Sequence, residues 1–213
     1  KTQGTINSQL YVANVFGLKY KNVQVLAPYM GGGFGSGLRP QYQLFFAAMA
    51  ALDLKSNVRV TLSRKQMFTF GHRPANQQRL KFSADENGKL TAINHETVSE
   101  TSTFEDYTET VSEWSHKLYP AENTLFKYQI ASLDFYTPID MRAPGGSTAF
   151  PAIECVMDEL ACGAGIDPLD FRLINYAEVD PATKKPFTSK ALRECYKEAA
   201  EAFGWEKRKP QPG

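Results

Sequence analysis

A glycine-rich loop at residues 30–40 constrains this chain more than any other feature. It reads MGGGFGSGLRP, so five of its residues are glycine. Residues 22–28 (NVQVLAP) precede it and alternate apolar with polar side chains, which predicts a half-buried strand. Residues 41–55 follow it, are rich in Ala, Leu, Phe and Met, and predict a helix packed into a core. We therefore expect the loop to run from a strand into a helix.

Such a connection can hold an anion or an oxygen-rich group with its backbone alone. Glycine permits positive φ angles and lets a ligand approach the main chain, and the N–H groups that start the following helix favour negative charge. The dinucleotide pattern G-x-G-x-x-G is incomplete, because Ser36 stands in the third glycine position, and the P-loop pattern is absent. A tight connection without any ligand is the alternative.

The same order of elements recurs later in the chain. Residues 124–137 predict extended chain, residues 138–147 (PIDMRAPGGS) a second glycine-containing loop, and residues 149–163 a buried helix. One such loop is easily a mere connection. Two loops that meet across a shared cofactor would make a site.

The remaining patterns complete a mixed α/β fold with packed helices. They predict a helix at 5–17, a strand at 57–62, a capping box at Ser63–Gln66, a hairpin of 78–84 and 90–99, and helices that begin near Asp167 and Ser189. Residues 104–119 give no clear pattern. We expect one partial domain at residues 1–206 and a disordered, proline-rich tail at 207–213.

Composition excludes several classes of function. The net charge of +1 gives no electrostatic reason to expect nucleic acid or a membrane as partner, and no apolar run is long enough to span a bilayer. Three cysteines without a C-x-x-C pair argue against a disulfide framework and a zinc site. Cys155 and Cys162 are expected to be core residues. Because the three histidines are scattered as well, we expect no metal ligated by protein side chains.

Four segments together resemble one known family over essentially the whole chain. They are Thr2-Gln3-Gly4, Gly32-Gly33-Phe34-Gly35, Ile139-Asp140-Met141-Arg142-Ala143-Pro144-Gly145, and the run from Glu154 through GIDPLDFRL to Asn175. This order resembles the molybdenum-binding subunit of the xanthine dehydrogenase and aldehyde oxidase family. The residues of the two loops are most similar to those of bacterial aldehyde oxidoreductases of the periplasmic kind.

The resemblance implies roles for particular residues. Gln3 would hydrogen-bond an oxygen of the molybdenum centre, and Arg142 would lie close to the cofactor. The other implied cofactor-binding residues are Gly32, Gly33, Phe34, Gly35, Ala143 and Gly145. Arg39 could place a cation at the site, steering a carboxylate-bearing substrate or stabilising an oxyanion; the alternative is an ion pair at the start of a helix.

Two departures from the family pattern bear on the substrate. Leu38 stands where xanthine-oxidising members place a glutamate, and Pro144 stands where they place an aromatic side chain. Neither suits a purine, so the resemblance implies an aldehyde that is oxidised to a carboxylic acid with oxygen from water. The family's general base, a glutamate in a C-terminal Gly-x-Gly-Glu motif, has no counterpart here. We therefore interpret the chain as a fragment of the subunit that is inactive alone.

The resemblance also implies a cofactor and partners. The cofactor would be molybdopterin, plain or as its cytosine dinucleotide, with iron–sulfur clusters and FAD on partner subunits or domains. The compartment would be the cytoplasm or the periplasm. Two alternatives stay open: an NADP-binding module, in which Ser63-Arg64-Lys65 accommodates a 2′-phosphate, and a non-catalytic assembly domain in which both loops only pack.

Overall fold

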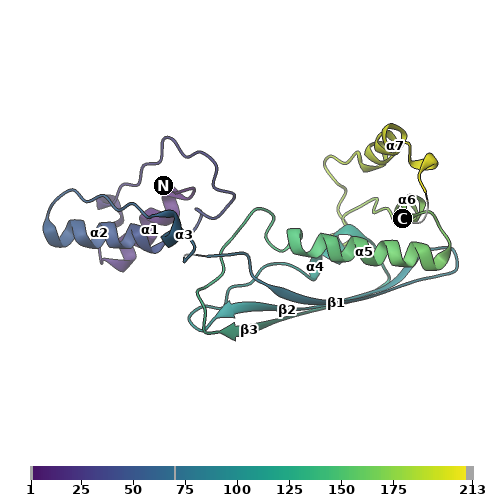
Figure 1. The fold of residues 1–213 in the computed structure, drawn as a ribbon, viewed down its shortest axis with the longest axis horizontal. Coiled ribbons are helices and arrows are strands. Elements are labelled where there is room, and N and C mark those ends of the chain that lie inside the picture. The colour runs from purple at the N-terminus through teal and green to yellow at the C-terminus, as the bar shows by residue number, and fades with distance from the viewer. Residues whose placement is uncertain (1, 70, 210–213) are drawn as a thin grey trace. The chain divides into compact units, whose positions relative to one another are not determined.

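The computed structural model describes residues 2–69 and 71–209, and the chain divides into two compact units. The first comprises the described residues of Lys1–Gln77, Thr97–Val111 and Tyr128–Ser147. The second comprises those of Gln78–Glu96, Ser112–Lys127 and Thr148–Gly213. Figure 1 labels the helices and strands of both units. Both glycine-containing loops belong to the first unit.

Helices account for most of the regular structure at the start of the first unit. They are α1 (Thr5–Val15), a 3-10 turn (Tyr20–Asn22), α2 (Tyr42–Leu54) and α3 (Arg64–Met67). The predicted helices at 5–17 and 41–55 are confirmed, and so is the capping box, since the Ser63 N–H donates to Gln66 Oε1 at 2.8 Å. The predicted packing of α2 is wrong, because none of its residues is buried and Phe46 and Met49 are each 52% exposed.

The two strands predicted beside α2 are also wrong. Residues 22–28 and 57–62 form no strand in the described chain. Along 22–28 the alternation of burial is nevertheless real: Val23, Val25 and Ala27 are half-buried and the residues between them are exposed. Alternating sequence reports one-sided burial, whereas a strand also needs a hydrogen-bonded neighbour. The Val23 carbonyl instead accepts from Gln9 Nε2 at 2.7 Å.

The strands of the described residues form a three-stranded sheet. Its strands are β1 (Asn76–Ala84), β2 (Leu90–Ser102) and β3 (Asn123–Leu133), in the order β1-β2-β3. The predicted hairpin is confirmed: the Asp85 N–H donates to the Lys89 carbonyl at 2.9 Å, and Gly88 turns the chain with φ of 80°. β3 ends four residues before the predicted limit of 137. Helices and sheet together confirm the mixed α/β fold.

The second unit is built mainly on one helix, α5 (Gly146–Ala164), which starts at the end of the first unit. Ala149, Ile153, Met157 and Ala161 recur every fourth residue and are all 0% exposed, which places them on one helix face. The predicted burial of Cys155 and Cys162 is wrong; both are exposed, because heptad spacing put them together on a different face. Cys195 is exposed as well.

Shorter helices complete the second unit. They are α4 (Glu113–Leu118), α6 (Pro168–Ile174), α7 (Leu192–Phe203) and a 3-10 turn (Trp205–Lys207). Asp167 caps α6 as predicted, with the Leu169 N–H donating to its carboxylate at 2.8 Å. Ser189 does not cap α7, whose N-cap is Ala191. Residues 210–213 of the predicted tail lie outside the described residues.

One buried histidine illustrates how the second unit satisfies polar groups in its core. His95 is fully buried, with Nδ1 2.7 Å from Ser115 Oγ and Nε2 3.0 Å from Gln78 Oε1. Burial lowers the pKa of His95 to about 4, so the ring is neutral at pH 7.

In the described part of the chain, no helix combines the length and apolar character needed to cross a membrane.

Candidate cofactor-binding site

The first loop, residues 30–40, is held in a tight conformation by its own backbone. Gly31 and Gly35 have φ of 66° and 90°, and Phe34 shares this left-handed region with φ of 53°, which is uncommon for a side chain of that size. Two short turns close the loop, with the Ser36 N–H donating to Gly33 O and the Leu38 N–H to Gly35 O, each at 3.0 Å. The backbone around Gly31 stays open, since a Cβ added there would meet nothing within 4 Å.

Gln3 is bound to this loop on both its backbone and its side chain. Its N–H donates to the Gly37 carbonyl at 2.8 Å, and its Oε1 accepts from the Gly37 N–H at 2.9 Å. The side-chain amide lies directly against Gly33, where an added Cβ would come within 2.5 Å of Oε1 and 3.1 Å of Nε2. The Nε2 group carries the only donors of the Gln3 side chain, so it is the part that can donate to a ligand.

A cavity of about 440 Å³ borders the first loop within the same unit. Part of its wall comes from the loop and part from residues 59–62, which the sequence predicted as a strand. Its lining residues are Met30, Gly33, Ser36, Gly37, Gln41, Gln43, Arg59, Val60, Thr61, Leu62 and Met67. The glycine backbone of the loop is therefore accessible from at least one side.

The second loop, residues 138–147, meets the first at Gly35. A Cβ added to Gly35 would lie 3.7 Å from the Asp140 carbonyl oxygen and 3.9 Å from the Arg142 nitrogen. Arg142 and Ala143 are exposed, and Ala143 has φ of 55°. The structure thus brings together the two loops that would make a site if they met.

Arg39 connects the two loops through ion pairs. Its Nη1 lies 2.7 Å from Glu105 Oε1 and its Nε 3.1 Å from Asp140 Oδ2, while the guanidinium stands over the Tyr107 ring at 5.1 Å. Partial burial opposes its charge, but Asp140 and Glu105 outweigh that effect and raise the pKa of Arg39. The ion pair that the sequence left open as an alternative is therefore present, on a side chain that is still 43% exposed.

Two residues that the sequence analysis did not identify lie beneath the second loop. Glu109 and Tyr107 are only 4% and 2% exposed. Glu109 Oε2 accepts from the Gly145 N–H at 2.7 Å, and Glu109 Oε1 accepts from the Tyr107 hydroxyl at 3.1 Å. Both come from residues 104–119, whose mixture of acidic and aromatic side chains gave no periodic pattern. Tyr107 and Glu109 stand two positions apart, the spacing that places side chains on one side of an extended segment, and this was the one indication available.

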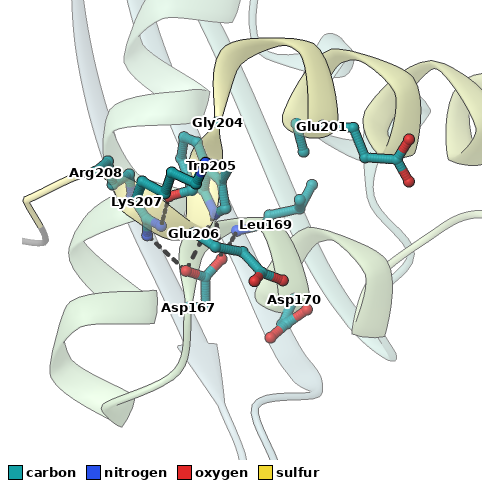
Figure 2. A pocket seen from close by; sticks show the side chains of 10 residues that line it. Asp167, Leu169, Asp170, Glu201, Gly204, Trp205, Glu206, Lys207 and Arg208 are labelled. Carbon is teal, nitrogen blue, oxygen red and sulfur yellow. Dashed lines mark hydrogen bonds and ion pairs between the residues drawn. The ribbon is translucent and has the colours of Figure 1, made fainter.

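A separate cavity of about 660 Å³ lies in the second unit, around the end of α7 (Figure 2). Asp167 forms its polar centre, accepting from Trp205 Nε1 at 3.1 Å and from Arg208 Nη2 at 2.5 Å. Burial opposes ionisation of Asp167, but these donors and the Leu169 N–H outweigh it and lower the pKa of Asp167. These donors satisfy the Asp167 carboxylate, and none of the predicted site residues lines the cavity.

The loop residues fit an oxygen-rich, anionic cofactor. Gln3 Nε2 is a donor positioned beside Gly33, the backbone at Gly31 is open, and the exposed Arg142 side chain supplies a positive charge. Pterin, phosphate and oxo groups accept hydrogen bonds from amide and guanidinium donors. Within residues 2–69 and 71–209, no three His, Cys, Asp or Glu side chains are grouped so as to hold a metal ion.

Comparison with known proteins identifies related chains. Residues 1–176 match the family described as the molybdopterin cofactor-binding domain. The molybdenum-binding subunit PaoC of an aldehyde oxidoreductase from Escherichia coli (strain K12) is 39% identical over 205 residues, covering 95% of this chain and 28% of PaoC. XdhA, described as a putative xanthine dehydrogenase molybdenum-binding subunit of the same strain, is 28% identical, covering 94% of this chain and 28% of XdhA.

Solved structures show the same fold. The aldehyde oxidoreductase from Desulfovibrio gigas superimposes with a TM-score of 0.85 at 21% identity, covering 96% of this chain and 23% of that chain. The CO dehydrogenase from Oligotropha carboxidovorans gives 0.83 at 16% identity, covering 97% and 27%. This chain thus spans between 23% and 28% of the length of these four relatives.

The family match favours the cofactor interpretation over a nucleotide-binding module, which also required a second strand that residues 57–62 do not form. The matched residues, 1–176, include both glycine-containing loops, Gln3, and the residues that hold the second loop. The chain belongs to the molybdopterin cofactor-binding domain family.

Proposed function

We propose that this chain supplies cofactor-binding loops to a molybdenum hydroxylase that oxidises aldehydes to carboxylic acids. In that reaction the aldehyde and one water give the acid, two protons and two electrons. The observation that carries the proposal is the arrangement at Gln3, whose amide oxygen is fixed by Gly37 while its Nε2 faces the first loop. The 39% identity to the subunit of an aldehyde oxidoreductase supports the choice of reaction.

In this proposal the two loops bind and orient the cofactor. Gln3 Nε2 would donate to an oxygen of the metal centre, and the backbone of Gly32, Gly33, Phe34 and Gly35 would approach the pterin. Arg142, with the backbone of Ala143 and Gly145, would hold the cofactor from the second loop. When bound, the molybdenum cofactor supplies the oxygen-transfer and electron-accepting chemistry.

Two residues support an aldehyde over a purine as the proposed substrate. Leu38 and Pro144 provide neither the carboxylate nor the aromatic ring that the resemblance associates with purine oxidation. Arg39 directly follows Leu38, and its guanidinium is partly exposed beside Asp140. We propose that Arg39 stabilises negative charge near the substrate, over and above the ion pairs that hold it.

The complete enzyme requires parts that this chain does not carry. We propose iron–sulfur and FAD subunits or domains as the path for the electrons, and a glutamate general base from elsewhere in the subunit. The cofactor is proposed as molybdopterin or its cytosine dinucleotide. The enzyme is proposed to act in the cytoplasm or the periplasm of a bacterium.

Molybdenum content, measured by mass spectrometry on the complete native subunit purified with its partners, tests the proposal. We expect about one molybdenum per subunit, and its loss when Gly33 or Arg142 is replaced, because each contributes to the same small set of donors. Hydrolysis of the purified enzyme followed by chromatography of the released nucleotide identifies the cofactor form. No molybdenum in cells that load other molybdenum enzymes would overturn the proposal.

A further inference from the structure

The second loop is fixed from two sides by side chains outside it. Arg73 Nη2 donates to the Arg142 carbonyl at 2.7 Å, and its Nη1 reaches the Ala143 carbonyl at 3.4 Å. From below, Glu109 Oε2 accepts from the Gly145 N–H at 2.7 Å. The Arg142 and Ala143 carbonyls thus face a cation, and the Gly145 amide faces a carboxylate.

Glu109 has no cationic partner among the described residues, although it is buried. A buried carboxylate is costly unless hydrogen bonds satisfy it. Here the donors are the Gly145 N–H and the Tyr107 hydroxyl. Gly145 directly precedes α5, so the carboxylate also lies at the positive end of that helix.

Tyr107 extends the connection to a second point of the loop. Its hydroxyl lies 3.1 Å from Glu109 Oε1 and 3.3 Å from Asp140 Oδ1. Burial and the two neighbouring carboxylates raise the pKa of Tyr107 far above its ordinary value, so the hydroxyl keeps its proton and acts as a donor. The Glu109 carboxylate is therefore connected to both ends of the segment that contains Arg142: directly to Gly145, and through the Tyr107 hydroxyl to Asp140.

We propose that Glu109 is a positioning residue for the cofactor, which fixes the backbone of the second loop through Gly145 and, through Tyr107, Asp140. This inference rests on the proposed function, because it assigns Glu109 a purpose beyond capping α5. A glycine at 145 is required by the same geometry: an added Cβ would lie 1.7 Å from the Thr110 carbonyl oxygen. The close approach of the two segments leaves the Glu109 carboxylate in direct contact with the loop amide.

Three substitutions in the complete enzyme test this role. Glu109→Ala removes both hydrogen bonds, whereas Glu109→Gln can keep them, with Oε1 on the Gly145 N–H and Nε2 donating to a reoriented Tyr107 hydroxyl. Tyr107→Phe removes the hydroxyl that contacts both Glu109 and Asp140 but leaves the bond between Glu109 and the Gly145 N–H. Glu113→Gln is the matched control, because Glu113 is exposed and lies four residues further on.

The measurements are molybdenum per folded subunit and the electron paramagnetic resonance spectrum of the molybdenum(V) state, alongside thermal unfolding. We expect Glu109→Ala to lose molybdenum about ten-fold, the effect of one buried charged hydrogen bond, with a changed spectrum in what remains. Glu109→Gln should stay within about two-fold of wild type, and Tyr107→Phe should fall between the two.

The outcomes separate this inference from the proposed function. Wild-type enzyme without molybdenum would overturn the proposed function itself. Wild-type loading together with an unchanged spectrum and content in Glu109→Ala would overturn only the positioning role and leave Glu109 as a helix cap. If Glu109→Ala does not fold, the inference is decided by Tyr107→Phe, which leaves the Glu109–Gly145 bond intact: a wild-type spectrum and content there would overturn it.

Discussion

The two glycine-containing loops meet at one place but are held by different chemistry. The first loop, residues 30–40, is fastened by Gln3 and by its own short turns, and its backbone at Gly31 is open. The second, residues 138–147, rests on the buried Glu109 and packs against Thr110 with no room for a Cβ at Gly145. Glycine therefore provides access in the first loop and close packing in the second.

Gly145→Ala should give the largest effect on this comparison. The added methyl would overlap the Thr110 carbonyl oxygen, which belongs to the backbone and cannot turn away, and φ of 71° strains any side chain. We expect the free energy of unfolding of the complete subunit to fall by at least about 3 kcal/mol, measured by denaturant titration.

Gly31→Ala is the matched control, because φ is nearly the same at 66° but nothing lies within 4 Å of the new methyl. Only the conformational strain remains, so its cost should be about 1 kcal/mol. Equal losses for the two variants would show that backbone strain alone requires both glycines and would remove the distinction between the loops.

Arg39→Ala addresses the link between the loops. If the guanidinium stabilises charge at the substrate, kcat/KM of the complete enzyme for an aldehyde should fall about ten-fold or more. Asp140→Asn removes one of its ion pairs and keeps the cation, so it should reduce kcat/KM by less. Steady-state kinetics of both variants, with the exposed Arg64→Ala as control, make the comparison. Equal losses for Arg39→Ala and Asp140→Asn would contradict the role at the substrate and leave a structural ion pair.

Gly33→Ala probes how the first loop holds Gln3. The new methyl would lie 2.5 Å from Gln3 Oε1, so the side chain must turn away and give up its bond to the Gly37 N–H. We expect a loss of about 1 kcal/mol in unfolding free energy, together with loss of molybdenum. In a Gln3→Ala background the methyl has room, and the same substitution should then cost little. Strictly additive losses would show that Gly33 and Gln3 act independently.

The sequence predicted the features of the fold that depend on neighbouring residues. Glycines in residues 30–40, the capping box at Ser63 and the turn at Gly88 act over a few positions, and the structure forms each of them. The burial of α2 was predicted wrongly, because an apolar helix pattern does not say whether another surface covers it. The strands predicted at 22–28 and 57–62 failed for a related reason, since alternation does not supply a hydrogen-bonded neighbour.

Contacts between distant residues were beyond sequence reasoning. Glu109 and Gly145 are 36 positions apart, and their hydrogen bond depends on the path of the chain between them. The ion pair of Arg39 with Asp140 spans 101 positions. The sequence showed the same order of extended segment, loop and helix twice and so raised the possibility that the two loops share a site, but not which side chains would hold them.

Ala143→Gly should give the smallest effect and concerns a feature that the loops share. Each loop holds one non-glycine residue in the left-handed region, Phe34 at 53° and Ala143 at 55°. Glycine at 143 relieves a strain of about 1–2 kcal/mol but adds roughly 0.5–1 kcal/mol of unfolded-state entropy. The net expectation is an increase in unfolding free energy of about 0.5 kcal/mol, measured by denaturant titration. A clear decrease would instead show that the Ala143 methyl contributes packing to the second loop. The second loop would then be closely packed at its exposed residue Ala143 as well as at Gly145, unlike the open first loop.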